Sequence, residues 1–310
     1  MSSTPNLLRP SPLKQGDKVA VVAPASPFDR EAMLRGVRRI EGWGYQVQYR
    51  EDIFSRKRYL AGSDERRFEE LFQALNDPAI KAVFAARGGY GSQRLLPMLD
   101  AAAPPSQPKI LLGYSDLSSL LIYAMQTWNW VTFHGPVVAK DIGDRMENSG
   151  EASLLRVLQD PRPLGKISPP SACCLQGGEA EAPLVGGCLS LITCTLGTPY
   201  RLATSGKILY LEDVGEILYS LDRMLTHLRL AGVFNGVKGL VFGPLKDAHD
   251  EPEVIKAMLQ DVLGDLQIPM LFGFPSGHIE DSLTVPFGLK VRLNASEGSV
   301  EFLEEALANT

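Results

Sequence analysis

Cysteine is scarce in this sequence, and the few cysteines lie in one short region. The four of them, Cys173, Cys174, Cys188 and Cys194, show no Cys-x-x-Cys spacing and no histidine at zinc-finger distance. Because disulfides are rare in cytosolic proteins, we expect four reduced thiols. The sequence therefore predicts no metal and no other cofactor.

Long hydrophobic runs are missing as well. No stretch approaches the ~18 uninterrupted apolar residues that a bilayer span requires. The first residues, MSSTPNLLRPSPLKQGDKVAVVAPAS, lack the cationic segment and long apolar run of a secretory signal, and their prolines would break a signal helix. We therefore expect a cytoplasmic protein.

An excess of basic charge is absent. The 31 basic and 36 acidic residues are spread along the chain and give a net charge of -5, so we expect neither nucleic acid nor a membrane surface as a partner. The P-loop pattern G-x-x-x-x-G-K-[ST] is missing, and the glycines do not have the spacing of a Rossmann fingerprint. These two nucleotide-binding motifs are excluded.

What the sequence does contain is an alternation of short apolar runs and amphipathic segments. Strands are predicted over 16–25, 45–49, 80–86 and 109–112. Helices are predicted from Ser26, as a cap, to Gly44, over 64–75, from Ser92 and over 117–125. This alternation is typical of a doubly wound parallel sheet, whose ligands bind at the carboxyl ends of the strands. The loops after Ala86 and Leu112 lie at that edge.

The length and a change in composition indicate two domains. A chain of 310 residues exceeds the usual size of one domain, and residues 161–183 are rich in proline, glycine and small side chains. We therefore predict an N-terminal domain over 1–160, a linker over 161–183 and a C-terminal domain over 184–310. The elements predicted in the last domain are helices over 188–196, 216–230 and 253–263, strands over 207–213 and 237–243, and short strands after Ile268.

A serine stands where a strand turns into a helix. In GYSDLS, residues 113–118, such a turn can expose the hydroxyl of Ser115, although the match to the esterase pattern G-x-S-x-G is partial. Ser115 could act as a nucleophile if a histidine and an acid assist it. It could instead cap the helix through its side-chain oxygen. The stretch alone leaves both roles open.

The RGGYG loop at 87–91 offers backbone amides without side-chain obstruction. Such amides could stabilise an oxyanion beside the serine or hold a phosphate. The glycines could also do no more than make a tight turn.

Four histidines limit the search for a base. His249 and His227 are expected on the surface, because the first lies in a polar segment and the second on the polar side of a helix. His278 follows an apparent strand and a glycine, and His134 precedes Gly135 and Pro136. These two are the candidates.

The acid has three candidates around one strand end. Glu212 and Asp213 close the apolar strand KILYLED, and Glu216 begins the next helix. Glu216 is explained by the helix dipole. Adjacent strand residues point to opposite sides, so Glu212 and Asp213 remain alternatives.

Six blocks of the sequence together resemble the LD-carboxypeptidase family. They are RGGYG (87–91), GYSDLS (113–118), TFHGP (132–136), GGCLSLITCTLGTPY (186–200), LEDVGE (211–216) and GHIEDSLTVPFG (277–288). The resemblance implies a serine peptidase with a triad of Ser115, Glu212 and His278. It also implies a flavodoxin-like N-terminal domain carrying the serine, a swivelling C-terminal β/α domain carrying the acid and base, and a site between them. Members of this family use no metal and are commonly homodimers.

The resemblance also implies a substrate and a mechanism. The substrate would be the murein tetrapeptide or a related muropeptide, which loses its terminal D-alanine during peptidoglycan recycling. His278 would take the proton of Ser115, Glu212 would orient the imidazole, and the amides of Gly88, Gly89 and Asp116 would hold the oxyanion. On chemical grounds Arg87 could grip the substrate carboxylate, or it could be a surface arginine.

The sequence departs from the family at three positions outside the triad. Cys188 stands where an asparagine is usual, Leu218 where a proline is usual, and Val137 where methionine is frequent. Cys188 could change how a substrate is held, or it could pack as a small apolar residue.

Three other functions remain as alternatives. A microcin-immunity-type peptidase that cleaves peptidyl nucleotides would need an aromatic platform near the linker, which has no aromatic residue. A non-catalytic binding module of the same fold would use Ser115 structurally. An ordinary esterase would act on simple esters.

Overall fold

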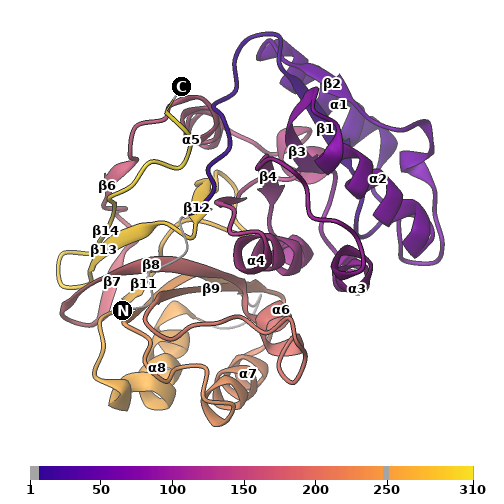
Figure 1. The fold of residues 1–310 in the computed structure, drawn as a ribbon. Helices are drawn as coiled ribbons and strands as arrows, with labels where there is room; N and C mark the ends of the chain where they lie inside the picture. The colour runs from indigo at the N-terminus through magenta and orange to yellow at the C-terminus, as the bar shows by residue number, and fades with distance from the viewer. Residues whose placement is uncertain (1–6, 247–250, 310) are drawn as a thin grey trace. The chain divides into compact units, whose positions relative to one another are not determined.

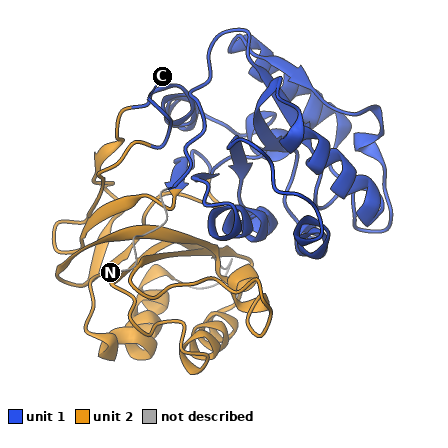
Figure 2. Cartoon of the chain, viewed as in Figure 1, with its two compact units in different colours: residues 1–161, 280–286, 306–310 blue, residues 162–279, 287–305 orange. Residues whose placement is uncertain are grey.

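The computed structural model describes residues 7–246 and 251–309, and this part of the chain forms two compact units. Unit 1 comprises Met1–Pro161, Glu280–Pro286 and Ala306–Thr310, and unit 2 comprises Arg162–Ile279 and Phe287–Glu305 (Figure 2). Unit 1 is therefore made of three separate segments of the chain.

Unit 1 is built on a six-stranded sheet with the order β12-β5-β4-β3-β1-β2 (Figure 1). Its strands are β1 (Lys18–Val22), β2 (Gln46–Gln48), β3 (Ile80–Ala85), β4 (Ile110–Gly113), β5 (Thr132–His134) and β12 (Val285–Phe287), whose last residue falls in unit 2. Its helices are α1 (Arg30–Gly42), α2 (Asp64–Asn76), α3 (Leu96–Asp100), α4 (Ser118–Thr127) and α5 (Asn148–Gln159). Short helical turns are η1 (Glu51–Phe54), η2 (Ser92–Leu95), η3 (Ser115–Leu117) and η4 (Val138–Ile142).

Strands β1 to β5 of this sheet pair in parallel. Their order, β2-β1-β3-β4-β5, is that of flavodoxin-like folds, in which ligands bind where the strand order reverses, between β1 and β3. The predicted doubly wound parallel sheet is confirmed. The loops after β1 and β3 therefore flank the position where this fold usually places a ligand.

Local sequence accounts for the helices that follow these strands. The side chain of Asp29 accepts a hydrogen bond from the Ala32 amide at 2.8 Å and caps α1, so the prediction that Ser26 is the cap is wrong. Asp29 is the residue with extended backbone directly before the helix, as a cap requires. Ser63 caps α2 in the same way by accepting from the Arg66 amide at 3.2 Å.

Unit 2 contains an eight-stranded sheet with the order β6-β14-β13-β8-β9-β10-β11-β7. Its strands are β6 (Gly165–Ile167), β7 (Cys173–Gln176), β8 (Glu179–Cys188), β9 (Ile208–Val214), β10 (Gly239–Lys246), β11 (Met270–Phe272), β13 (Lys290–Asn294) and β14 (Ser299–Phe302). Its helices are α6 (Leu189–Cys194), α7 (Leu218–Leu230) and α8 (Pro252–Leu263), with a short turn η5 (Gly264–Leu266). Strands β8 to β11 are parallel, and the outer pairs are antiparallel. The predicted C-terminal β/α fold is confirmed.

The structure divides the chain differently from the predicted boundaries in two places. Residues 161–183, which composition predicts to be a linker, contain β6, β7 and the first part of β8. Strands β6 and β7 are the two edges of the sheet and are only partly buried, so they lack the apolar alternation that identifies a strand. Residues 280–286 and 306–310 join unit 1, which local sequence could not indicate.

No helix in the described parts of the chain is both long enough and apolar enough to cross a lipid bilayer.

Candidate active site

Ser115 begins the turn η3, with Tyr114 between it and the end of β4, and its backbone is strained. Its φ angle is 64°, a left-handed conformation that costs a non-glycine residue about 1 kcal/mol or more. The side chain of Ser115 lies against Gly88, where an added Cβ would stand 2.9 Å from the serine Cβ and 3.1 Å from its Oγ. The turn therefore places the hydroxyl beside the glycine loop.

Ser115 does not cap the helix that follows it. The residues at the cap positions of η3 and α4 are Tyr114 and Leu117, and neither element has a side-chain cap. The alternative in which the serine is merely a helix cap is therefore wrong. Strain at a residue without a capping role is typical of a functional turn.

The glycine loop after β3 is fixed by Ser26, which follows β1. Ser26 Oγ accepts from the Tyr90 amide at 3.0 Å, and the Ser26 amide donates to the Gly88 carbonyl at 3.2 Å. In the described chain, the amides of Gly88 and Gly89 donate no hydrogen bond of their own. These amides are available to meet a negatively charged oxygen.

Arg87 is exposed at the start of this loop. One nitrogen of its guanidinium, Nη1, donates to the Pro27 carbonyl at 2.6 Å. That bond ties the side chain to the segment after β1 and leaves further donors for a ligand, since a guanidinium carries five.

Asp116 ties the serine turn to the segment after the glycine loop. Its Oδ2 accepts from the Ser92 amide at 2.8 Å, and its carbonyl accepts from Ser92 Oγ at 2.5 Å. Burial raises the pKa of Asp116, although the bonds from Ser92 oppose this shift. The side chain of Asp116 thus anchors the turn that carries Ser115.

Replacing Gly88 by alanine is expected to impair catalysis by displacing Ser115, because the new Cβ would come within 2.9 Å of the serine Cβ. We expect kcat to fall by about 100-fold, the cost of misplacing a reacting group by ~1 Å. The matched control is Gly42→Ala in α1, where an added Cβ meets nothing within 4 Å. A Gly88→Ala enzyme with the kcat of the control would contradict this role of the glycine.

In unit 2, Glu212 and His278 form a hydrogen-bonded pair. Glu212 Oε2 lies 2.7 Å from His278 Nδ1 and also accepts from the His278 amide at 3.2 Å. Glu212 is fully buried in β9, and 6% of the His278 side chain is exposed. A carboxylate can only accept, so Nδ1 is the nitrogen of His278 that donates in this pair.

The loop that carries His278 can approach Glu212 this closely only because residue 277 is glycine. Gly277 has a φ of 111°, and a Cβ there would lie 2.3 Å from Glu212 Oε2. The same loop is held by the buried Tyr210, whose hydroxyl donates to the Ser276 carbonyl. Burial raises the pKa of Tyr210 well above its ordinary value, so the hydroxyl keeps its proton and remains a donor.

Asp213 and Glu216 have other roles. Asp213 Oδ2 accepts from the Ser190 amide at 2.7 Å at the start of α6, and Oδ1 accepts from the Val214 amide at 2.8 Å. Glu216 accepts a hydrogen bond from the hydroxyl of Ser220 at the start of α7. Of the three acids around this strand end, Glu212 is the one that contacts a histidine.

Cys188, which replaces the usual asparagine, is buried beside Asp213. Its Sγ lies 3.4 Å from Asp213 Oδ2 and 3.3 Å from Ser190 Oγ. Burial raises the pKa of the thiol well above its ordinary value, and the nearby carboxylates of Asp213 and Glu212 act in the same direction. Cys188 is therefore a protonated thiol that supports the start of α6.

Asp213 makes stability depend on pH. Burial raises its pKa above the ordinary 3.8, while the backbone donors of Ser190 and Val214 oppose the shift. The folded state then holds this proton more tightly than the unfolded state does. The resulting stabilisation is present below pH 3.8 and is lost as the pH rises through the folded pKa.

An Asp213→Asn variant removes this titration. The free energy of unfolding of the wild type, minus that of the variant, should decrease as the pH rises from about 4 and become constant above the folded pKa. Urea unfolding of both proteins across this range measures it. A difference that increases with pH would show that the carboxyl is stabilised in its charged form.

The other three histidines are not part of the pair formed by Glu212 and His278. His134 is fully buried in β5, with its ring edge-on to Tyr114 at 5.9 Å between centroids, so it belongs to the core of unit 1. His227 is exposed on α7, as predicted. His249 lies outside the described residues.

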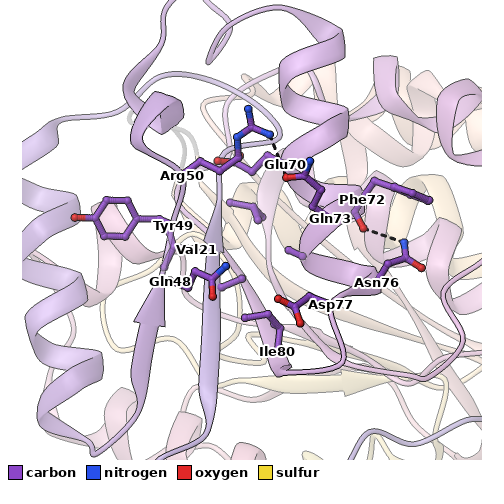
Figure 3. Close-up of a pocket in the computed structure, with 13 residues that line it drawn as sticks. Val21, Gln48, Tyr49, Arg50, Glu70, Phe72, Gln73, Asn76, Asp77 and Ile80 are labelled. Atoms are coloured by element: carbon purple, nitrogen blue, oxygen red, sulfur yellow. Dashed lines mark hydrogen bonds between the residues drawn. The ribbon is translucent and has the colours of Figure 1, made fainter.

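A cavity of about 470 Å³ in unit 1 contains none of the candidate catalytic residues. Figure 3 shows it bordered by Gln48, Arg50, Glu70 and Gln73. Of the charged side chains there, Arg50 is paired with Asp52 at 2.9 Å and Glu70 with Arg66 at 2.6 Å. Within the described residues, no group of histidines, cysteines and acids is arranged to hold a metal ion.

Sequence patterns did not identify the residues that support these groups. Ser26 and Ser92 hold the glycine loop and the serine turn, and Tyr210 holds the histidine loop through Ser276. Two sequence signals could have identified them. Ser26 is a polar residue just after a predicted strand, at the edge where ligands bind. Tyr210 is a tyrosine inside a buried apolar strand, so its hydroxyl needs a hydrogen-bond partner.

Comparison with known proteins agrees with this architecture. The model of the LD-carboxypeptidase N-terminal domain matches residues 19–135, and that of the LD-carboxypeptidase C-terminal domain matches residues 181–293. A probable murein peptide carboxypeptidase of Bacillus subtilis is 35% identical over 302 residues, which cover 93% of this chain and 92% of that protein. A murein tetrapeptide carboxypeptidase of Pseudomonas aeruginosa is 33% identical over 286 residues, which cover 87% and 91%.

The fold is also shared with a solved structure. A structure of the microcin C7 self-immunity protein MccF, a protein known from Escherichia coli, matches 97% of this chain and 100% of its own with a TM-score of 0.88. Its sequence identity of 23% shows a common fold alone.

Together, the fold and these matches define a carboxypeptidase made of an N-terminal and a C-terminal α/β part. The chain belongs to the LD-carboxypeptidase family.

Proposed function

We propose that this protein is a cytoplasmic LD-carboxypeptidase that removes the terminal D-alanine from murein tetrapeptides through an acyl-enzyme. The observation that carries the proposal is the pair formed by Glu212 and His278 at 2.7 Å, because a buried carboxylate that orients an imidazole is the arrangement that activates a serine. Relatives named for murein peptides support the substrate class. The family resemblance supports a homodimer and a role in peptidoglycan recycling.

In this mechanism, Ser115, His278 and Glu212 act as nucleophile, base and orienting acid. His278 Nε2 accepts the proton as Ser115 Oγ attacks the carbonyl carbon of the bond to D-alanine. Glu212 stabilises the imidazolium, which then gives its proton to the departing amine of D-alanine. Water, activated by the same imidazole, attacks the ester and releases the tripeptide.

The glycine loop supplies the oxyanion site. The amides of Gly88, Gly89 and Asp116 would donate to the oxygen that gains charge, and each donor of this kind is worth about 3 to 4 kcal/mol in the transition state. Arg87, held by its bond to the Pro27 carbonyl, would bind the carboxylate of the terminal D-alanine.

Mass spectrometry of three substrates tests the function. We expect a murein tetrapeptide ending in D-alanine to lose one alanine residue, and the epimer ending in L-alanine to stay intact. The third substrate is an aminoacyl sulfamoyl adenosine. Cleavage of both epimers, or of neither, would contradict the LD-carboxypeptidase proposal.

The alternative activity is that of a microcin-immunity-type peptidase. It is favoured by the fold shared with MccF, for which a complex with aspartyl sulfamoyl adenosine is known. Cleavage of the sulfamoyl adenosine in place of the tetrapeptide would establish this second function.

A further inference from the structure

Two exposed aromatic side chains meet near the glycine loop of unit 1. Tyr59 is 53% exposed and Tyr90 is 46% exposed, and their ring centroids lie 5.7 Å apart with the planes at 62°. Both rings belong to unit 1 and come from different loops. Adjacent exposed aromatics of this kind are a common feature of binding sites, because one surface offers both apolar faces and polar tips.

The loop that carries Tyr59 is a rigid and strained turn. The amide and carbonyl of Lys57 bond to those of Leu60 at 2.9 and 3.0 Å, which leaves Arg58 and Tyr59 at the apex. Arg58 has a φ of 58°, a conformation that is unfavourable for a residue with a side chain. Leu60 is buried and packs against Gly91, so the turn is fastened to the end of the glycine loop.

The position of Tyr90 is fixed as well. Its amide donates to Ser26 Oγ at 3.0 Å, and it follows Gly88 by two residues. Two residues span at most about 7 Å, so the tyrosine begins within that distance of the glycine that touches Ser115. The backbone of Tyr90 therefore lies close to the glycine that contacts the proposed nucleophile.

The chemistry of the pair suits a sugar ring. Rings inclined at 62° form a corner, which cannot sandwich a flat heterocycle but can receive the apolar C–H face of a pyranose on one ring. The two phenol hydroxyls can then bond to sugar oxygens. The Arg58 guanidinium lies 5.5 Å from the centroid of Tyr59, where it adds donors for carbonyl or carboxylate oxygens.

The proposed substrate carries such a ring at a suitable distance. In a muropeptide, the sugar is joined to the first residue of the stem, and the bond to be cut follows the third. Three extended residues span about 10 Å. This agrees with a tyrosine whose backbone lies within about 7 Å of the glycine beside Ser115 and whose ring contacts that of Tyr59.

We propose that Tyr59 and Tyr90 form a binding subsite for the muramyl sugar of muropeptides. This inference rests on the proposed function and adds a preference for sugar-bearing substrates over free tetrapeptide. No sequence motif assigns the two tyrosines this role.

The test compares two substrates, the free tetrapeptide and the same peptide joined to N-acetylmuramic acid. The quantity is the ratio of their kcat/KM values. Tyr59→Ala should lower the ratio of muramyl to free peptide by about tenfold, and Tyr59→Phe by less, because the ring remains. Tyr49→Ala, which removes another exposed tyrosine of unit 1, should leave the ratio unchanged. An equal fall for both substrates, or none, would overturn the subsite.

A binding measurement separates this inference from the proposed function. Calorimetric titration with muramyl tripeptide, which lacks the bond to be cut, should give a higher affinity than free tripeptide in the wild type. Tyr59→Ala should abolish most of that difference. If the wild type cleaves neither tetrapeptide, the proposed function fails, and the titration still decides the subsite. Equal affinity of the wild type for the two tripeptides would reject the subsite.

Discussion

Replacing Ser115 by alanine is expected to lower kcat for the murein tetrapeptide by about 10⁴-fold to 10⁶-fold. The hydroxyl is the proposed attacking group, and no neighbouring side chain can take its place from the same strained turn. The fold should persist, because alanine is no larger than serine and Ser115 caps no helix. We expect stability to change little or to rise slightly. Steady-state kinetics and urea unfolding measure the two effects.

The matched control for this variant is Ser296→Ala. Ser296 is exposed in unit 2, where its hydroxyl accepts a hydrogen bond from the Gly178 amide at 3.0 Å. Its loss should leave kcat within about twofold of the wild type, as expected for a surface substitution away from the reacting groups. If the kcat of Ser115→Ala equals that of this control, Ser115 is a structural residue and not the nucleophile.

The Glu212→Gln substitution is expected to lower kcat by about 10⁴-fold, as in comparable triads. The carboxylate of Glu212 accepts from both Nδ1 and the backbone amide of His278. A glutamine presents a neutral amide, so it no longer stabilises the imidazolium, and its NH₂ group favours the tautomer with the proton on Nε2. That tautomer cannot take the proton of the serine.

The control for this substitution is Glu216→Gln. Glu216 accepts from the Ser220 hydroxyl at the start of α7, so its conversion should affect the helix and leave kcat near the wild-type value. Comparable losses in the two variants would mean that Glu212 acts through general electrostatics and not through His278.

The sequence was sufficient to predict the central strands of unit 1, because β1, β3 and β4 are short apolar runs that are almost wholly buried. β1 and β3 show this directly, since four of five and five of six residues are buried. Edge strands such as β6 and β7 escaped prediction because only part of each is buried. The return of residues 280–286 to unit 1 depends on contacts far apart in sequence, which no local pattern encodes.

The candidate site was predictable only in part, because contacts between residues far apart in the sequence decide the role of each candidate. Glu212 and Asp213 are neighbours with the same charge, and only the fold shows that one faces His278 while the other holds the start of α6. The φ of Ser115 and the contact of its side chain with Gly88 are likewise visible only in the folded structure. Residue types at strand ends therefore identified candidates, and three-dimensional contacts were needed to separate their roles.

The central claim is that Ser115 is acylated during turnover. Mass spectrometry of the enzyme after acid quenching in the first turnovers with the tetrapeptide tests it most directly. The account predicts a covalent tripeptidyl adduct on the proteolytic fragment that contains Ser115, and neither adduct nor turnover in Ser115→Ala. An adduct on another fragment, or release of D-alanine by the Ser115→Ala enzyme at the wild-type rate, would contradict it.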